Sequence, residues 1–182
     1  DVANSINNIT GQSACKWLVM EWDGRESSGI FVGNPIGWLL RNVNSSLALF
    51  KDNGIRSFSK VLIAIRPGRR NKRFIDVADK ICCHFGASLT LLHIVSESDN
   101  NQKIKRIEKS SSELISETKS KSAVKIIKSS NPVEAISEAS ASYDLLILGT
   151  PEKDNWIRVL FGSGEDRFVK KAACSVLRLT IK

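Results

Sequence analysis

The feature that most constrains the fold is a regular alternation of short apolar runs with segments of helical periodicity. Five strand-type runs occur in the last two thirds of the chain: Lys60–Ile65, Leu89–Val95, Ala123–Ile127, Leu145–Leu148 and Ser175–Ile181. Between them, apolar residues recur at the spacing of one face of a helix. Alternating strands and helices require a parallel sheet with helices on both faces, and right-handed crossovers fix its hand. The sequence therefore predicts an α/β fold with a doubly wound, open, five-stranded parallel sheet.

The C-terminal 40 residues have the layout of a phosphate site. The strand Leu145–Leu148 is stopped by Gly149, and a loop leads to Gly162, Ser163 and Gly164, after which a helical pattern begins. Glycines let the backbone approach an anion, and the free amides at a helix N-terminus point at its charge. A glycine loop between a buried strand and a helix indicates an anion-binding site.

This stretch resembles the C-terminal signature of the universal stress protein family. Gly149 and Gly162-Ser163 fall on the first and last glycine positions of that signature, while Glu152 stands at the middle one. The segment Gly86–Ile94, GASLTLLHI, is similar to the end of the family's first helix and its second strand. The resemblance implies the universal stress protein fold, also described as adenine nucleotide alpha hydrolase-like, with ATP or AMP as candidate ligands.

The candidate nucleotide or anion site lies where parallel strands end, because ligands of doubly wound sheets bind outside the carboxyl ends of the strands. The residues expected there are Ile65, Arg66, Pro67, Gly68, Arg69, Ile94, Gly149, Thr150, Gly162, Ser163 and Gly164. Nucleotide-binding members of the family place an Asp at the end of the first strand, where this chain has Arg66. Arg66 and Glu152 thus remove two expected contacts. Two readings stay open: retained binding of ATP or AMP, and a degenerate site that serves only as scaffold.

The first 53 residues repeat the end of the chain. Gly33-Asn34 falls on Gly162-Ser163 at an offset of 129, and Leu18–Met20 falls on Leu146–Leu148 at an offset of 128. This self-similarity indicates an internal duplication. We expect residues 1–53 to be the C-terminal part of a first module and residues 54–182 to be a complete second module. The first part must then complete its fold with further residues or pack on its twin.

The charge is unevenly placed. The chain has 27 basic and 19 acidic residues, a net charge of +8, and the first 53 residues contribute −1 of it. Five cations fall within eight residues beside the candidate site: Arg66, Arg69, Arg70, Lys72 and Arg73. This run is either a seat for an anionic ligand or a solubilising loop. A nucleic acid partner is not expected, since the run lacks interleaved aromatic residues and a groove-reading motif.

No pattern of catalytic or metal-binding residues is apparent. His84 and His93 have no nucleophile at a recognisable spacing, and the four cysteines lack metal-type spacing. We therefore expect no enzyme and no metal site, with His93 in the core and the cysteines as buried free thiols of a reducing compartment. Trp22 and Trp38 are expected to pack in the core or between the modules.

Two functions are consistent with these observations. The first is a non-catalytic cytosolic regulatory or interaction domain, part of a larger membrane transporter whose sequence continues ahead of Asp1. Amino-acid permeases, cation-chloride cotransporters and cation-proton antiporters resemble this pattern at their tails. Such a domain would associate with itself, either as a homodimer or by packing between modules. Its other partners would be the membrane domain of the same polypeptide and an anionic ligand. The second is a soluble ATP- or AMP-binding universal stress protein. In both cases the domain is cytoplasmic, tethered to the membrane in the first.

Overall fold

The computed structural model describes residues 2–12, 15–22, 42–66, 71–150 and 166–182. Within these ranges the helices are α1 (Val2–Gln12), α3 (Asn71–Phe85), α4 (Asn101–Ile115), α5 (Pro132–Ser140) and α7 (Arg167–Lys171). The strands are β1 (Trp17–Glu21), β2 (Ser46–Lys51), β3 (Lys60–Ala64), β4 (Ser88–Val95), β5 (Ser122–Lys128), β6 (Leu145–Gly149) and β7 (Ser175–Thr180).

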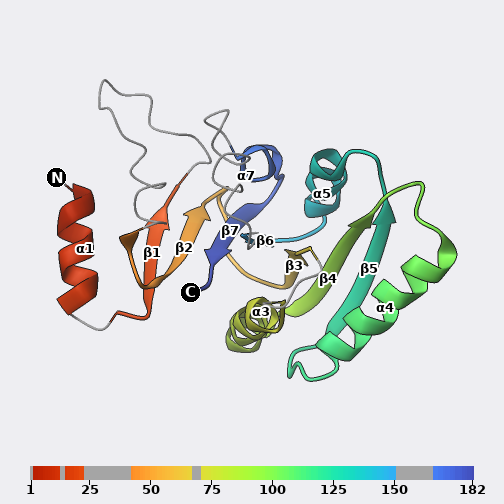
Figure 1. Cartoon of the computed structure of the whole chain (residues 1–182), viewed down its shortest axis with the longest axis horizontal. Helices are drawn as coiled ribbons and strands as arrows, with labels where there is room; N and C mark the ends of the chain where they lie inside the picture. Colours follow the sequence, from red (N-terminus) through yellow and green to blue (C-terminus); the bar gives the residue numbers. More distant parts are fainter. Residues whose placement is uncertain (1, 13–14, 23–41, 67–70, 151–165) are drawn as a thin grey trace.

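The described strands form one sheet in the order β1-β2-β7-β6-β3-β4-β5 (Figure 1). The five strands β7 to β5 are all parallel, which confirms the predicted doubly wound sheet. β1 and β2 are also parallel to each other, but β2 pairs with β7 in the antiparallel direction. The sheet therefore continues beyond the predicted five strands and reverses direction once.

Helices cover both faces of the sheet. α3 and α4 lie on one face, and α5 and α7 lie on the other (Figure 1). The central strand β3 has a run of four buried residues from Val61 to Ala64, as expected of a parallel strand covered on both sides. α3 buries a stripe of four residues against this core: Phe74, Ile75, Ala78 and Cys82.

Local signals in the sequence account for the end of α3 and the start of α5. Gly86 ends α3 in the left-handed region with φ 66°, where glycine has no Cβ to clash. Asn131 caps α5 by accepting a hydrogen bond from the Glu134 amide, and Pro132 occupies the first turn. The sequence also predicts a helix that starts at Pro35 and has Ile36, Leu39, Leu40 and Val43 on one face; its residues up to position 41 lie outside the described part of the chain.

The pairs β1–β2 and β6–β7 have equivalent registers. Leu18 lies opposite Leu47, and Leu146, at an offset of 128 from Leu18, lies opposite Val176, at an offset of 129 from Leu47. In the antiparallel ladder Leu49 lies opposite Arg178, its own counterpart at an offset of 129. The four strands therefore have an approximate two-fold axis that passes through the Leu49–Arg178 pair.

Hydrogen bonds across the β2–β7 junction follow the same two-fold axis. The Asn53 amide donates to Ser175 Oγ at 2.9 Å, and the Lys182 amide, 129 residues later, donates to Ser46 Oγ at 3.2 Å. The Asn53 side chain donates to the Ala172 carbonyl, and the Lys182 ammonium donates to the carbonyl of Val43. Reciprocal contacts of this kind are the mark of an isologous interface.

The cysteines are free, as predicted, but only two of them are buried. Cys82 and Cys174 lie in the core, and burial raises the pKa of each thiol to about 11. Cys83 is exposed and Cys15 is half-buried, so the prediction of burial is wrong for these two. The neighbours Cys82 and Cys83 differ because successive helical positions point about 100° apart, and the apolar stripe of α3 includes only Cys82.

Candidate functional site

The ends of three neighbouring parallel strands bring part of the predicted site together. β3 lies between β6 and β4 in the sheet, so their carboxyl ends meet at one edge. Ile65 and Arg66 follow β3, Ile94 lies near the end of β4, and Gly149 ends β6. Ile65 is buried, whereas Arg66 is exposed, so the described cation at this edge projects into solvent.

Gly149 is needed for a close approach between β6 and its neighbours. A Cβ at this position would lie 3.1 Å from Ile65 Cγ2 and 3.2 Å from the Phe74 ring. Both distances are shorter than ordinary van der Waals contact, and Ile65 and Phe74 are themselves buried. The glycine therefore packs the end of β6 against the end of β3 and the first turns of α3.

We predict that Gly149→Ala lowers the free energy of unfolding by about 1 to 3 kcal/mol, because the added methyl overpacks a filled site. Urea denaturation measures this change. The matched control is Gly11→Ala in α1, where a Cβ would meet nothing within 4 Å and helix propensity favours alanine. A Gly149→Ala variant as stable as the unchanged chain would contradict the packing described above.

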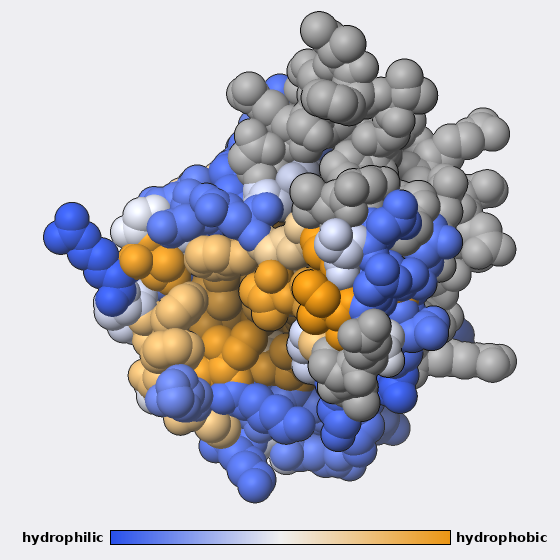
Figure 2. All heavy atoms as spheres, turned by 90° about the vertical axis from the view of Figure 1, so that its left-hand side faces the viewer, coloured by the Kyte–Doolittle hydropathy of each residue, from blue (hydrophilic) through white to orange (hydrophobic). Residues whose placement is uncertain are grey.

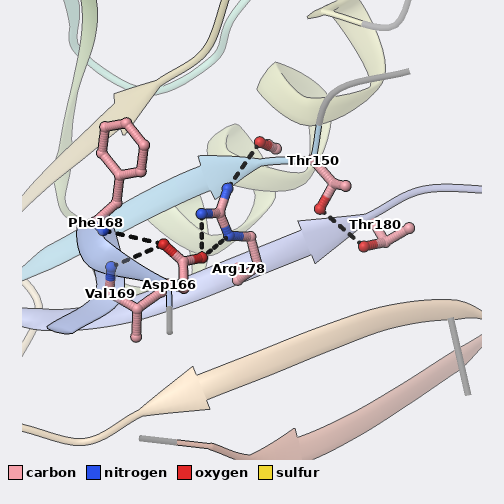
Figure 3. Close-up of polar contacts among 7 residues, drawn as sticks. Thr150, Asp166, Phe168, Val169, Arg178 and Thr180 are labelled. Carbon is pink, nitrogen blue, oxygen red and sulfur yellow. Dashed lines mark hydrogen bonds and ion pairs between the residues drawn. The ribbon is translucent and has the colours of Figure 1, made fainter. Parts of the chain in front are cut away.

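Thr150 is attached to β7 rather than directed at an open site. Its amide donates to the Leu179 carbonyl at 2.9 Å, and its hydroxyl lies 2.9 Å from the hydroxyl of Thr180 (Figure 3). The side chain is buried. Thr150 thus fixes the point at which the chain leaves β6, and its hydroxyl already has a protein partner.

Asp166 and Arg178 form a buried ion pair that the sequence analysis missed. The Asp166 carboxylate accepts from Arg178 Nε at 2.8 Å and also from Nη2, while Nη1 donates to the Gly149 carbonyl at 3.1 Å (Figure 3). The other carboxylate oxygen caps α7 by accepting from the amides of Phe168 and Val169. Both ionic side chains are almost fully buried.

This pair joins three parts of the candidate site. Arg178 in β7 holds the end of β6 through Gly149 and the start of α7 through Asp166. Together with the hydrogen bonds of Thr150, it ties Thr150 and Asp166, two residues far apart in the sequence, to β7. Since the guanidinium is neutralised by a buried carboxylate, Arg178 is a structural cation rather than a free anion ligand.

Two sequence signals could have revealed the pair. Arg178 interrupts an otherwise apolar strand at a position that the alternation of strand residues directs into the core, where a cation needs a partner. Asp166 follows the glycine motif and precedes a helical pattern, which is the preferred place of an N-cap residue. Their pairing itself could not be predicted, because it depends on the strand order.

His93 supports the end of β3 from inside the core. The imidazole is buried, and burial lowers its pKa, while a hydrogen bond to the Ile65 backbone opposes that shift. Nε2 has no hydrogen-bond partner among the residues that the structure describes. His93 is thus held in the neutral form, next to the residue that leads into the candidate site.

This burial predicts a pH dependence of stability. Because the folded-state pKa of His93 is below its value of about 6.5 in the unfolded chain, the unfolded chain binds more protons as the pH falls. His93 therefore contributes fully to the free energy of unfolding above a pH of about 6.5, and this contribution is lost progressively as the pH falls below that value. We expect His93→Gln to reduce the loss of stability between pH 7 and pH 5 in urea titrations. An unchanged slope would contradict this role.

The two cations of the basic run that lie in α3 have different partners. Lys72 pairs with Glu117, and Arg73 donates to the Lys182 carbonyl. Pro67, Gly68, Arg69, Arg70, Glu152 and Gly162 to Gly164 lie outside the described residues. The structure therefore brings together Ile65, Arg66, Ile94, Gly149 and Thr150 and does not place the glycine motif.

The comparison with protein families settles the resemblance. The family described as "Universal stress protein family" matches residues 57–179, about two thirds of the chain. The chain belongs to the universal stress protein family. The matched residues contain β3 to β6 and all but the last residue of β7. No curated protein matches the chain at a significant level.

Solved universal stress proteins share the fold. One from Archaeoglobus fulgidus DSM 4304 aligns with a TM-score of 0.70 at 16% identity, covering 98% of this chain and 64% of its own. A universal stress protein in complex with cAMP aligns with a TM-score of 0.56 at 16% identity, covering 70% of this chain and 100% of its own. One from Archaeoglobus fulgidus in complex with dAMP aligns with a TM-score of 0.53 at 13% identity, covering 69% of this chain and 100% of its own. This universal stress chain thus spans less than two thirds of the first of these relatives.

Two kinds of feature are absent from the described residues. They contain no group of three His, Cys, Asp or Glu side chains that could hold a metal ion. Among them, no helix combines the length and the apolar character that crossing a bilayer requires.

Proposed function

We propose that this universal stress chain is a non-catalytic regulatory or interaction domain, built from the end of one module packed on a complete second module. The antiparallel pairing of β2 with β7 carries the proposal. It uses the last strand of the family fold to hold a second pair of α/β strands. The functional surface on this view is the sheet itself, extended by pairing, rather than a reaction centre.

The two-fold arrangement supports the duplication. The strand registers and the reciprocal hydrogen bonds of Asn53 and Lys182 relate residues that are 128 or 129 positions apart in the sequence. The trace of repeat in the sequence has the same offsets. Two unrelated segments would have no reason to share offset, register and contacts.

The state of the site supports a scaffold role. Arg66, in the place of the carboxylate that the family resemblance implies, is exposed at the end of β3. The hydroxyl of Thr150 pairs with Thr180, and the guanidinium of Arg178 pairs with Asp166. In the first module, the residues equivalent to Gly149 and Thr150 are Glu21 and Trp22, and Trp22 is buried in the core. In neither module, therefore, do the described residues supply all the nucleotide contacts that the family resemblance implies.

The domain would belong to a larger membrane transporter and act on its cytosolic side. The support is the sequence pattern shared with transporter tails, together with a fold whose described site lacks the expected nucleoside contact. The amino-acid sequence of the whole polypeptide tests this part. Membrane spans in it would support the transporter, and their absence would remove it.

The second candidate is an ATP- or AMP-binding protein. It is favoured by the relatives solved with cAMP and dAMP and by the meeting of β3, β4 and β6 at one edge. Fold alone does not carry function, so binding has to be measured on this chain.

Calorimetry with ATP, AMP, cAMP and dAMP separates the two candidates. The scaffold proposal predicts no saturable heat up to millimolar nucleotide, whereas a retained site would saturate with a Kd between about 1 μM and 1 mM. The matched variant is Arg66→Asp, which restores the carboxylate at the end of β3 and is expected to gain affinity if Arg66 is the block. Saturable binding by the unchanged chain would overturn the scaffold role.

A further inference from the structure

The strand β1 has an apolar face with little cover. It is an edge strand of the described sheet, and Val19 is 66% exposed and Trp17 36% exposed. Figure 2 turns this side of the molecule toward the viewer and shows apolar surface gathered around a hollow. Exposed edges and apolar areas of this kind are where proteins bind other chain segments.

The equivalent residues of the second module show what covers such a face. Ile147 and Leu145 in β6, each 128 residues after Val19 and Trp17, are 0% and 2% exposed. β3 pairs in parallel with β6 and places Ile63 opposite Ile147. The residues Phe74, Ile75 and Ala78 of α3 belong to the same core cluster as Ile147. A strand and the helix that follows it thus bury in β6 the positions that β1 exposes.

We propose that the outer edge and bare face of β1 dock a strand–helix unit of the same polypeptide, equivalent to Lys60–Phe85. The inference rests on the duplication in the proposed function. The docked strand would run parallel to β1 and be apolar on both faces, because it would be covered on both sides as β3 is. The apolar stripe of its helix would cover Trp17 and Val19 as α3 covers Leu145 and Ile147.

The lengths of the relatives favour a unit from the same polypeptide. The Archaeoglobus fulgidus DSM 4304 structure matches 98% of this chain but only 64% of its own length, so such relatives contain residues beyond this match. A second copy of residues 1–182 fits the surface less well. Two copies related by a two-fold axis would pair β1 with β1 in the antiparallel direction and would bring no helix to the face of Val19.

The test compares cysteine labelling in two polypeptides that carry Val19→Cys: residues 1–182 alone, and the whole natural polypeptide that contains them. A maleimide is the probe, and mass spectrometry of peptides gives the rate at each thiol. The exposed Cys83 in α3 is the internal reference, since it lies on the other module. We expect the thiol at position 19 to react about tenfold or more slowly in the whole polypeptide, with the rate at Cys83 unchanged.

Equal rates at position 19 in the two polypeptides would overturn the proposal, as would a natural polypeptide with nothing ahead of residue 1. Dimers of residues 1–182 that dissociate on Val19→Lys would assign the surface to a second copy and would also overturn it. The labelling rates do not depend on nucleotide. A failure of the docking proposal can therefore be distinguished from a failure of the scaffold role, which the calorimetry tests.

Discussion

Asp166→Asn is expected to destabilise the protein by about 3 to 5 kcal/mol, because it leaves the guanidinium of Arg178 buried without a counter-charge. The substitution keeps the size of the side chain and an oxygen that can cap α7, so the loss reports mainly on the ion pair. Equilibrium unfolding in urea, followed by circular dichroism, measures the change. The end of β6 should loosen as well, since Arg178 also holds the Gly149 carbonyl.

Two variants control this experiment. Asp166→Asn combined with Arg178→Met should recover most of the loss, because removing both charges leaves no unpaired ion. Glu134→Gln breaks the half-exposed pair with Lys171 and should cost no more than about 1 kcal/mol. Losses that simply add in the double variant, or a single variant as stable as the unchanged chain, would mean that the pair contributes nothing to this junction.

Leu49→Ala is expected to lower the free energy of unfolding by about 2 to 4 kcal/mol. Leu49 is buried in β2 on the two-fold axis of the β2–β7 junction, within a core cluster that also contains Leu148 of β6 and Val176 of β7. The truncation leaves a cavity where β2 packs on β6 and β7. Because both sides share this cluster, we expect one unfolding transition at a lower urea concentration.

Val19→Ala is the matched control for Leu49→Ala. Both residues are on the N-terminal strands, but Val19 is 66% exposed in residues 1–182, so its truncation should change stability by less than about 0.5 kcal/mol. If Leu49→Ala instead unfolds β1 and β2 alone and leaves the unfolding transition of strands β3 to β7 unchanged, the two parts of the sheet do not form one cooperative core.

Periodicity predicted most of the fold. The alternation from Lys60 to Ile181 led to the five parallel strands, and Gly86 and Asn131 marked the ends of their helices. These features depend on local physics, namely burial on two faces, helix capping and left-handed backbone conformation. They are therefore visible in a single sequence.

The candidate site was only partly predictable. The position of Gly149 at a strand end could be read from the apolar run before it, whereas the roles of Asp166 and Arg178 required knowledge of which strands lie side by side. The sequence likewise left two alternatives for the first 53 residues, namely that they complete their fold with further residues or that they pack on the repeated part, and it did not predict the pairing of β2 with β7. An offset in sequence indicates a repeat, but the direction and register in which the copies pair depend on contacts between residues far apart in the chain.

The most direct test of the account is the register of the β2–β7 ladder in solution. Cross-strand proton contacts measured by nuclear magnetic resonance on residues 1–182 would locate it. We predict contacts between strands centred on Leu49 and Arg178, running from Leu47 with Thr180 to Lys51 with Val176. A shifted register, or a β2 strand without contacts to β7, would contradict the two-fold junction on which the proposed function depends.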